Sequence, residues 1–476
     1  MGRSHVRRVG AAAAVALLVS ACALRAYEPR PIVPDEVAGK LTARDVSDAG
    51  LRAFLERHGF KPAEWPLKTW SLAGLTLMAI YFHPDMDVAR ANLEMQEAAK
   101  ITAGQRPNPT LGPELQHHSD LKSGTPWSVG VALDVAFETG GKREARQARA
   151  AALSEEARLA VGAAAWNVRV RLGERYTNLF AAQRETELLR RELAAVTEEV
   201  ALLERRQALG EASPSEASLA RIRQRELRLA LDSADGAIAT GTAALADSLG
   251  LPYSAAAALT LPFDEVASAK PEPLPAQAIE RTARDNRLDI RRALASYAAA
   301  EATLREEIAK QFPDLTLSPS LLWDQADWVK TLGLSVLAPI FNRNEGPIAE
   351  AEARRKLEAA KFTALLAQVM GQVSQTRLGY EAAVKAWVTA DGLVAAQTER
   401  LRQAEKLIAY GETDKLSLVQ AEIELVAAER AQLRARVEAL RALGAVEDAV
   451  QYPLYETGPL PDLTEGAGEA PGKGAP

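Results

Sequence analysis

The sequence is almost free of cysteine. Cys22 is the single cysteine among 476 residues, so no disulfide can form within the chain. A lone thiol also makes a poor metal site, because structural zinc sites need several cysteine or histidine ligands at short spacings.

The sequence also lacks the motifs typical of phosphate-binding, hydrolytic and zinc-binding sites. We find no phosphate-binding loop, no nucleophile elbow and no zinc-type spacing of cysteine and histidine. His117 and His118 are adjacent, and adjacent side chains on a strand point to opposite faces, which disfavours a shared metal. The sequence predicts no enzyme, no cofactor and no metal site. A net charge of −6 also argues against nucleic acid as a partner.

Long hydrophobic runs are absent beyond the first 21 residues. The longest apolar stretch, residues 72–82, has 11 residues, whereas a helix that crosses a bilayer needs about 20. If the mature chain crosses a membrane, it must do so with strands.

The N-terminus is built like a bacterial export signal. Three arginines precede an apolar run from Ala11 to Val19, and small residues follow. The residues VSAC at 19–22 look like a lipobox, which predicts a signal peptide over residues 1–21 and lipid attachment at Cys22. An ordinary signal followed by a chance cysteine is the alternative. By the sorting pattern known for bacterial lipoproteins, Ala23 favours the outer membrane.

The most informative feature is an internal repeat. The segment RPNPTLGPELQ from residue 106 matches FPDLTLSPSLL from residue 312, and three further pairs match in the same order, about 200 residues apart. We expect one unit over 83–252 and a second over 286–452, joined by a connector at 253–285 that is rich in proline and alanine. A lipid-anchored N-terminal segment (22–82) and a disordered tail (453–476) complete the organisation.

Each unit contains two segments with strand periodicity. Apolar residues alternate with small or polar ones from Trp127 to Phe137, again at 315–323 and 332–340, and more weakly at 109–118. Apolar-out and polar-in alternation over about ten residues is typical of transmembrane β-strands. Four strands cannot close a barrel, so we expect three copies to supply twelve. Asp134 and Glu138 on the polar face would favour cations.

A very long helix follows each strand pair. Residues 142–209 contain no proline, and a helix of that length spans about 100 Å. Apolar residues keep a heptad-like spacing from Leu189 to Leu203 and from Leu366 to Trp387, which predicts a coiled coil. Both long helices should end at a glycine and turn into a capped returning helix. A shorter helix is predicted over 45–59, with Asp45 or Ser47 as its cap.

A duplicated unit of this kind behind a lipoprotein signal resembles the TolC-like outer-membrane efflux protein family, over nearly all the chain from about residue 66. The segments FETGGKREARQARAA and APIFNRNEGPIAEAEARR are most similar to the CzcC-type heavy-metal branch. The resemblance implies a mainly α fold with a transmembrane β part: a homotrimer with a twelve-stranded barrel and a periplasmic helical tunnel. It also implies a passive exit duct for heavy-metal cations, with a periplasmic adaptor and an inner-membrane resistance-nodulation-division pump as partners.

The resemblance further assigns roles to residues at the hairpin tips and junctions. Adaptor-docking tips match at Leu209, Gly210, Ser213 and Leu219 in the first unit and at Tyr410, Gly411, Ser417 and Leu418 in the second. Candidate gate acids are Glu211, Glu216, Glu412 and Asp414, for which a capping or solvated role is the alternative. Strand-to-helix turns are expected at Gly140, Gly141, Asn342, Asn344 and Gly346.

Two other hypotheses stay open. A duct for drugs or other organic compounds would have the same fold. A coiled-coil adaptor or scaffold lipoprotein is the alternative from another class, and it would be held to the membrane by its lipid alone.

Overall fold

The computed structural model describes residues 26–60, 64–119, 126–325 and 327–454. Cys22, the predicted signal peptide and nearly all of the predicted tail lie outside the described residues. The chain divides into two compact units, with the boundary between Ala43 and Arg44. In the first unit the described residues form helix α2 (Pro34–Thr42), whose first turn carries Asp35 and Glu36. All further elements belong to the second unit.

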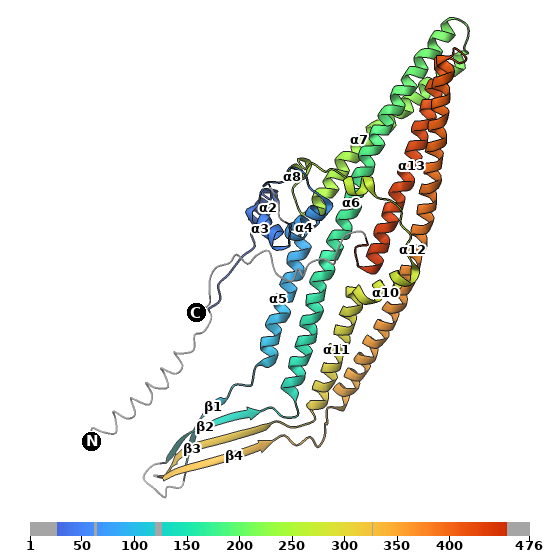
Figure 1. Ribbon diagram of the computed structural model, residues 1–476. Helices are drawn as coiled ribbons and strands as arrows, with labels where there is room; N and C mark the ends of the chain where they lie inside the picture. The colour runs from blue at the N-terminus through green and yellow to red at the C-terminus, as the bar shows by residue number, and fades with distance from the viewer. Residues whose placement is uncertain (1–25, 61–63, 120–125, 326, 455–476) are drawn as a thin grey trace. The chain divides into compact units, whose positions relative to one another are not determined.

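The second unit contains the duplicated, mainly helical fold that the sequence predicts, which is thereby confirmed. Figure 1 shows the two long helical hairpins, α6 with α7 and α12 with α13. The first copy runs α5 (Pro84–Gly104), β1 (Thr110–His117), β2 (Trp127–Phe137), α6 (Lys142–Ala208) and α7 (Pro214–Leu249). The second runs α11 (Leu288–Ala309), β3 (Leu315–Asp324), β4 (Asp327–Val336), α12 (Glu345–Ala409) and α13 (Lys415–Val450).

The four strands form one antiparallel sheet in the order β1-β2-β3-β4. The two copies therefore meet in the middle of the sheet, where β2 pairs with β3. Strand β4 ends at Val336, so the strand alternation predicted out to residue 340 is wrong at its end. Pro339 lies in that stretch, and proline has no N–H to donate to a ladder.

The predicted heptad positions of the long helices are largely buried. In α6, Leu189 and Val196 pack in a cluster with Leu227 of α7 and with Val419 and Ile423 of α13. The seam of α6 thus contacts its own hairpin partner and a helix of the other copy. In α12, a second cluster joins the seam to α13, and its buried members from these two helices are Val369, Val373, Tyr380, Val446, Ala449 and Val450.

The segment before the first copy packs against it. The apolar stretch 72–82 forms helix α4 (Leu72–Phe82), which is mostly buried against α6 and α7. Helix α3 (Ala49–Arg57) is capped by Asp48, whose Oδ1 accepts a hydrogen bond from Leu51 N at 2.7 Å. The predicted caps are therefore wrong, because Asp45 instead accepts a hydrogen bond from Ser47 N at 2.8 Å, one turn earlier. No helix in the described ranges is both long and apolar enough to cross a membrane.

The predicted connector contains three short helices, α8 (Tyr253–Ala257), α9 (Asp264–Ser268) and α10 (Ala276–Asn286). Tyr176 Oη of α6 accepts a hydrogen bond from Phe263 N at 3.1 Å, and Arg436 Nη2 of α13 donates to Val266 O at 2.8 Å. The connector is thus held to helices of both copies.

Candidate functional site

One face of the sheet is mostly apolar and exposed; Lys330, which pairs with Leu321 near the tryptophan end, is its one lysine among the described strand residues. In a protein surrounded by water, a continuous apolar patch of this kind marks an interaction surface. Aromatic side chains lie at both ends of the strands on this face. At one end the ring centroids of Trp323 and Trp328 are 5.1 Å apart, and at the other end Phe137 is the last residue of β2. The exposed apolar residues are Leu111, Leu115, Trp127, Val129, Val131, Leu133, Phe137, Leu315, Leu321, Trp328, Leu332, Leu334 and Val336.

The opposite face is polar, and its only charged side chains are acidic. Glu114, Asp134 and Asp324 lie on this face by the strand register, and no lysine or arginine of the described strands shares it. Asp134 accepts a hydrogen bond from Ser318 Oγ at 2.5 Å. At the far end of the sheet, Asp324 Oδ1 lies 2.9 Å from His118 Nε2. The face therefore favours cations over anions.

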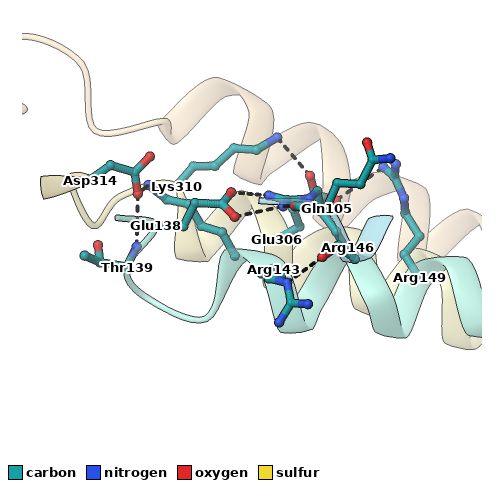
Figure 2. A network of polar contacts seen from close by, with 11 residues as sticks. Gln105, Glu138, Thr139, Arg143, Arg146, Arg149, Glu306, Lys310 and Asp314 are labelled. Atoms are coloured by element: carbon teal, nitrogen blue, oxygen red, sulfur yellow. Dashed lines mark hydrogen bonds and ion pairs between the residues drawn. The ribbon is translucent and has the colours of Figure 1, made fainter. Parts of the chain in front are cut away.

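Ion pairs join the two copies where strands turn into helices (Figure 2). Asp314, just before β3, accepts hydrogen bonds from Lys142 Nζ at 2.7 Å and from Thr139 N at 3.0 Å. Farther along, Arg149 of α6 pairs with Glu306 of α11 at 3.3 Å. These contacts hold the start of α6 against the segment that enters the second copy's strands.

Glu138 does not add free charge to the polar face, contrary to our expectation. Arg146 binds it through two contacts, Nη1 to Oε1 at 2.5 Å and Nη2 to Oε2 at 2.9 Å. This hydrogen bonding lowers the pKa of Glu138, so the carboxylate stays ionised but neutralised by its partner.

The junction turns use left-handed backbone in both copies. Gly140 and Gly141 have φ of +68° and +78°, and Asn344 has φ of 61° at the corresponding place. Asn342 supports that turn, because its Oδ1 accepts a hydrogen bond from Asn344 N at 2.8 Å. Gly346 lies within helix α12 and makes no such turn.

Both hairpin tips turn at a glycine. Gly210 and Gly411 have φ of +79° and +75°, which an L-residue adopts at a cost. The residues before them, Leu209 and Tyr410, cap the C-termini of α6 and α12 and are exposed.

Two of the four candidate gate acids cap the returning helices. Ser213 and Glu216 form a capping box at the start of α7, with Ser213 Oγ accepting from Glu216 N at 3.2 Å and Glu216 Oε2 accepting from Ser213 N at 3.0 Å. Asp414 caps α13 by accepting a hydrogen bond from Ser417 N at 2.9 Å. Glu211 and Glu412 are exposed.

Asp414 also links the two hairpins. Arg206, near the end of α6, pairs with its carboxylate, and the side chains are 35% and 43% exposed. The hydrogen bond from Ser417 N and the one from Arg206 lower the pKa of Asp414. A second pair beside it joins Lys415 to Glu198. The tip of one hairpin is thus tied to the other by two ion pairs near the surface.

A groove of about 430 Å³ opens beside this link. Three of the predicted tip residues line it, Glu211, Glu216 and Leu219, whereas Leu418 lies outside. Arg206 and Leu416 line it too, and neither was predicted from the sequence as a site residue. Their only sequence signal is their closeness to the tip glycines.

A buried carboxylate lies farther up the hairpins. Glu192 of α6 is 3.1 Å from Arg223 Nη2 of α7 and 2.7 Å from Arg430 Nη1 of α13, and its side chain is 5% exposed. Arg430 also binds Glu185 at 2.6 Å. This hub joins three helices of the two copies.

The described residues contain no group of three or more histidine, cysteine or acidic side chains placed to hold a metal ion. His117 packs edge-to-face against Trp127 with ring centroids 4.6 Å apart, while His118 Nε2 lies 2.8 Å from Ser128 Oγ on the other side of the sheet. The two histidines therefore point apart.

Comparisons with known proteins bear on these features. Residues 78–251 match the family model described as outer membrane efflux protein. The resemblance to this family is confirmed. A curated relative, the cobalt-zinc-cadmium resistance protein CzcC of Cupriavidus metallidurans, is 26% identical over 272 residues. The match covers 55% of this chain and 61% of that relative, so the chain spans less than two thirds of the relative's length.

Several solved membrane-protein structures superpose on most of the chain. The outer membrane protein VceC of Vibrio cholerae has a TM-score of 0.64 at 21% identity, over 80% of this chain and 95% of that one. CusC has a TM-score of 0.64 at 17% identity, over 90% and 99% of the two chains. The MtrE outer membrane channel of Neisseria gonorrhoeae has a TM-score of 0.62 at 19% identity, over 80% and 89%. The fold is thus that of outer-membrane channels.

Proposed function

We propose that this protein is the outer-membrane exit duct of a tripartite efflux system and conducts its substrate passively from the periplasm to the outside. The main observation that supports this proposal is the exposed apolar face of the sheet. At about 3.3 Å per residue and a tilt of about 45°, the 11 residues of β2 cover about 25 Å along the bilayer normal. That height matches the apolar band of outer-membrane strands, and the terminal tryptophans suit the interface.

The assembly follows from the number of strands. A sheet of four strands leaves open edges, which hydrocarbon does not tolerate, so three copies would close a twelve-stranded barrel. Lipid on Cys22 would add tethering and sorting. Helix α6, at about 1.5 Å for each of its 67 residues, would extend about 100 Å into the periplasm.

The tips would then dock a periplasmic adaptor, which connects to an inner-membrane pump of the resistance-nodulation-division type. The exposed side chains of Leu209 and Tyr410 and the groove at Leu219 and Leu416 support this role, because exposed apolar groups beside a groove suit a partner helix.

Heavy-metal cations are the substrate that we favour. The purely acidic polar face of the sheet and the likeness to a cobalt-zinc-cadmium resistance protein both support a cation. A passive duct needs no tight metal site, because tight binding would slow exit. Selectivity would then reside in the pump.

Deleting the gene in its host tests this function. We expect lower resistance to cobalt, zinc or cadmium, restored by the intact gene. Lost drug resistance with unchanged metal resistance would favour a duct for organic compounds. A Cys22→Ala protein that washes off membranes with carbonate would favour the scaffold lipoprotein instead.

A further inference from the structure

The sheet has two unpaired edges. Within the described part of the chain, strands β1 and β4 each have a neighbour on one side only. If the sheet lies in a bilayer, as the proposed function requires and as this inference assumes, the free N–H and C=O groups of both edges need a strand from another chain.

We propose that β4 of one protomer pairs antiparallel with β1 of the next in a single register, with Leu332 opposite the partner's Leu115. The partner is thus a second copy of this chain, bound through a defined row of residues. The internal repeat supplies the register.

The repeat relates the strands pairwise. The aligned segments RPNPTLGPELQ and FPDLTLSPSLL place Pro113 at the position of Pro319 and Leu115 at that of Leu321. Within the hairpins, Pro113 pairs with Val131 and Pro319 with Leu332. Leu332 in β4 therefore corresponds to Val131 in β2.

The seam between β2 and β3 then serves as the template for the missing one. There, Val131 lies opposite Leu321. Replacing each residue by its repeat equivalent puts Leu332 opposite the partner's Leu115.

The alternation of apolar and polar side chains along the two strands agrees with this register. It also places Leu334 opposite the partner's Pro113 on the apolar face and Thr331 opposite the partner's Gln116 on the polar face. A shift by one residue would set apolar side chains against polar ones along the whole seam. A shift by two residues would keep apolar side chains opposite apolar ones. Only the repeat therefore distinguishes the proposed register from one shifted by two.

Exposure of the equivalent residues points to a missing neighbour. Leu332 and Leu115 are 72% and 66% exposed, whereas their equivalents Val131 and Leu321, which have a strand on both sides, are 40% and 38% exposed. The edge residues lack the cover that a further strand gives to the inner pair.

Cysteine pairs test the register. Because pairs on the two faces of an antiparallel ladder alternate between closer and wider spacing, one pair is made on each face. These are Leu332→Cys with Leu115→Cys, and Thr331→Cys with Gln116→Cys. The matched controls move one partner by two residues, Leu334→Cys with Leu115→Cys and Thr331→Cys with Glu114→Cys. The chain without added cysteines is a further control, because any cross-link that it forms must involve the native Cys22.

After oxidation in outer-membrane vesicles, we expect covalent dimers and trimers on non-reducing gels from at least one matched pair. The shifted controls should give at least about five-fold less cross-linked product, since a diagonal separation of about 7–8 Å between the two residues exceeds the reach of a disulfide. Equal cross-linking by the controls, or none by either matched pair in a protein that is trimeric in detergent, would overturn the register. A protein that is monomeric in detergent would overturn the proposed function itself.

Discussion

Replacing Asp414 with asparagine should loosen the hairpin tip without unfolding helix α13. Asparagine caps helices about as well as aspartate, so the hydrogen bond from Ser417 N is kept. The charge that pairs with Arg206 across the two hairpins is lost. In the proposed duct, this change favours the state in which the tips are apart.

The size of the effect follows from exposure. Because both side chains of the Arg206–Asp414 pair are more than a third exposed, the pair contributes about 0.3–1 kcal/mol. The neighbouring pair of Lys415 and Glu198 remains. Three protomers that open together would lose about 1–3 kcal/mol, which raises the open population about 5- to 150-fold.

Single-channel recording in planar bilayers measures this population. Arg206→Gln should match Asp414→Asn, and the double variant should add little, because both remove the same interaction. Glu412→Gln is the matched control, since it removes an acid of the same tip that forms no ion pair within the described part of the chain. An Asp414→Asn channel that opens no more often than the Glu412→Gln channel would refute the reasoning.

The pH dependence of opening follows from the same contacts. The hydrogen bonds from Ser417 and Arg206 hold the pKa of Asp414 below its usual range, so the folded link is fully present above the ordinary aspartate pKa, about 3.9. The link is lost only as the pH falls through the lowered value. Acid should therefore open the unmodified channel, whereas the Asp414→Asn channel should lack that response.

Three further predictions concern other parts of the chain. Glu192→Gln, which weakens the buried hub with Arg430, should lower the free energy of unfolding by about 2–3 kcal/mol in a detergent melt. Gly140→Ala should cost about 1–3 kcal/mol more than Gly141→Ala in the same melt, because both have positive φ but only at Gly140 would a Cβ meet another atom within 3 Å. Asp134→Asn should reduce cation selectivity, seen as a reversal potential closer to zero in a salt gradient; an unchanged potential would place Asp134 away from the ion path.

The repeat made most of the fold predictable from the sequence. Its order of helix, strand, strand and helical hairpin depends on local periodicity, which the chain shows twice and which the structure reproduces. Even the weak alternation at 109–118 corresponds to β1 (Thr110–His117). Errors arose at the ends of elements, as at Asp48, where several neighbouring side chains compete to cap one helix.

Contacts between the copies could not be predicted in this way. Arg206 and Asp414 are separated by 208 positions, and Glu192 and Arg430 by 238. Such pairs depend on how two coiled hairpins pack side by side, and a single sequence carries no signal for that register. Glu138 shows a different, local limit. Its position on the polar face could be predicted, but the sequence did not indicate that Arg146, eight residues farther along the same copy, neutralises it.

The burial of the ion pairs determines where the two hairpins can separate. At the strand–helix junction, Lys142 is nearly buried where it meets Asp314, and at the hub Glu192 is buried between two arginines. Stripping a buried charge of its partner costs several times more than parting an exposed pair. The hairpins are therefore held firmly at the sheet and at the hub and most weakly near the tip, where the Arg206–Asp414 and Lys415–Glu198 pairs are both exposed. An adaptor that binds in the adjoining groove would need to supply only a small free energy to part them, so a duct built this way opens at its docking end.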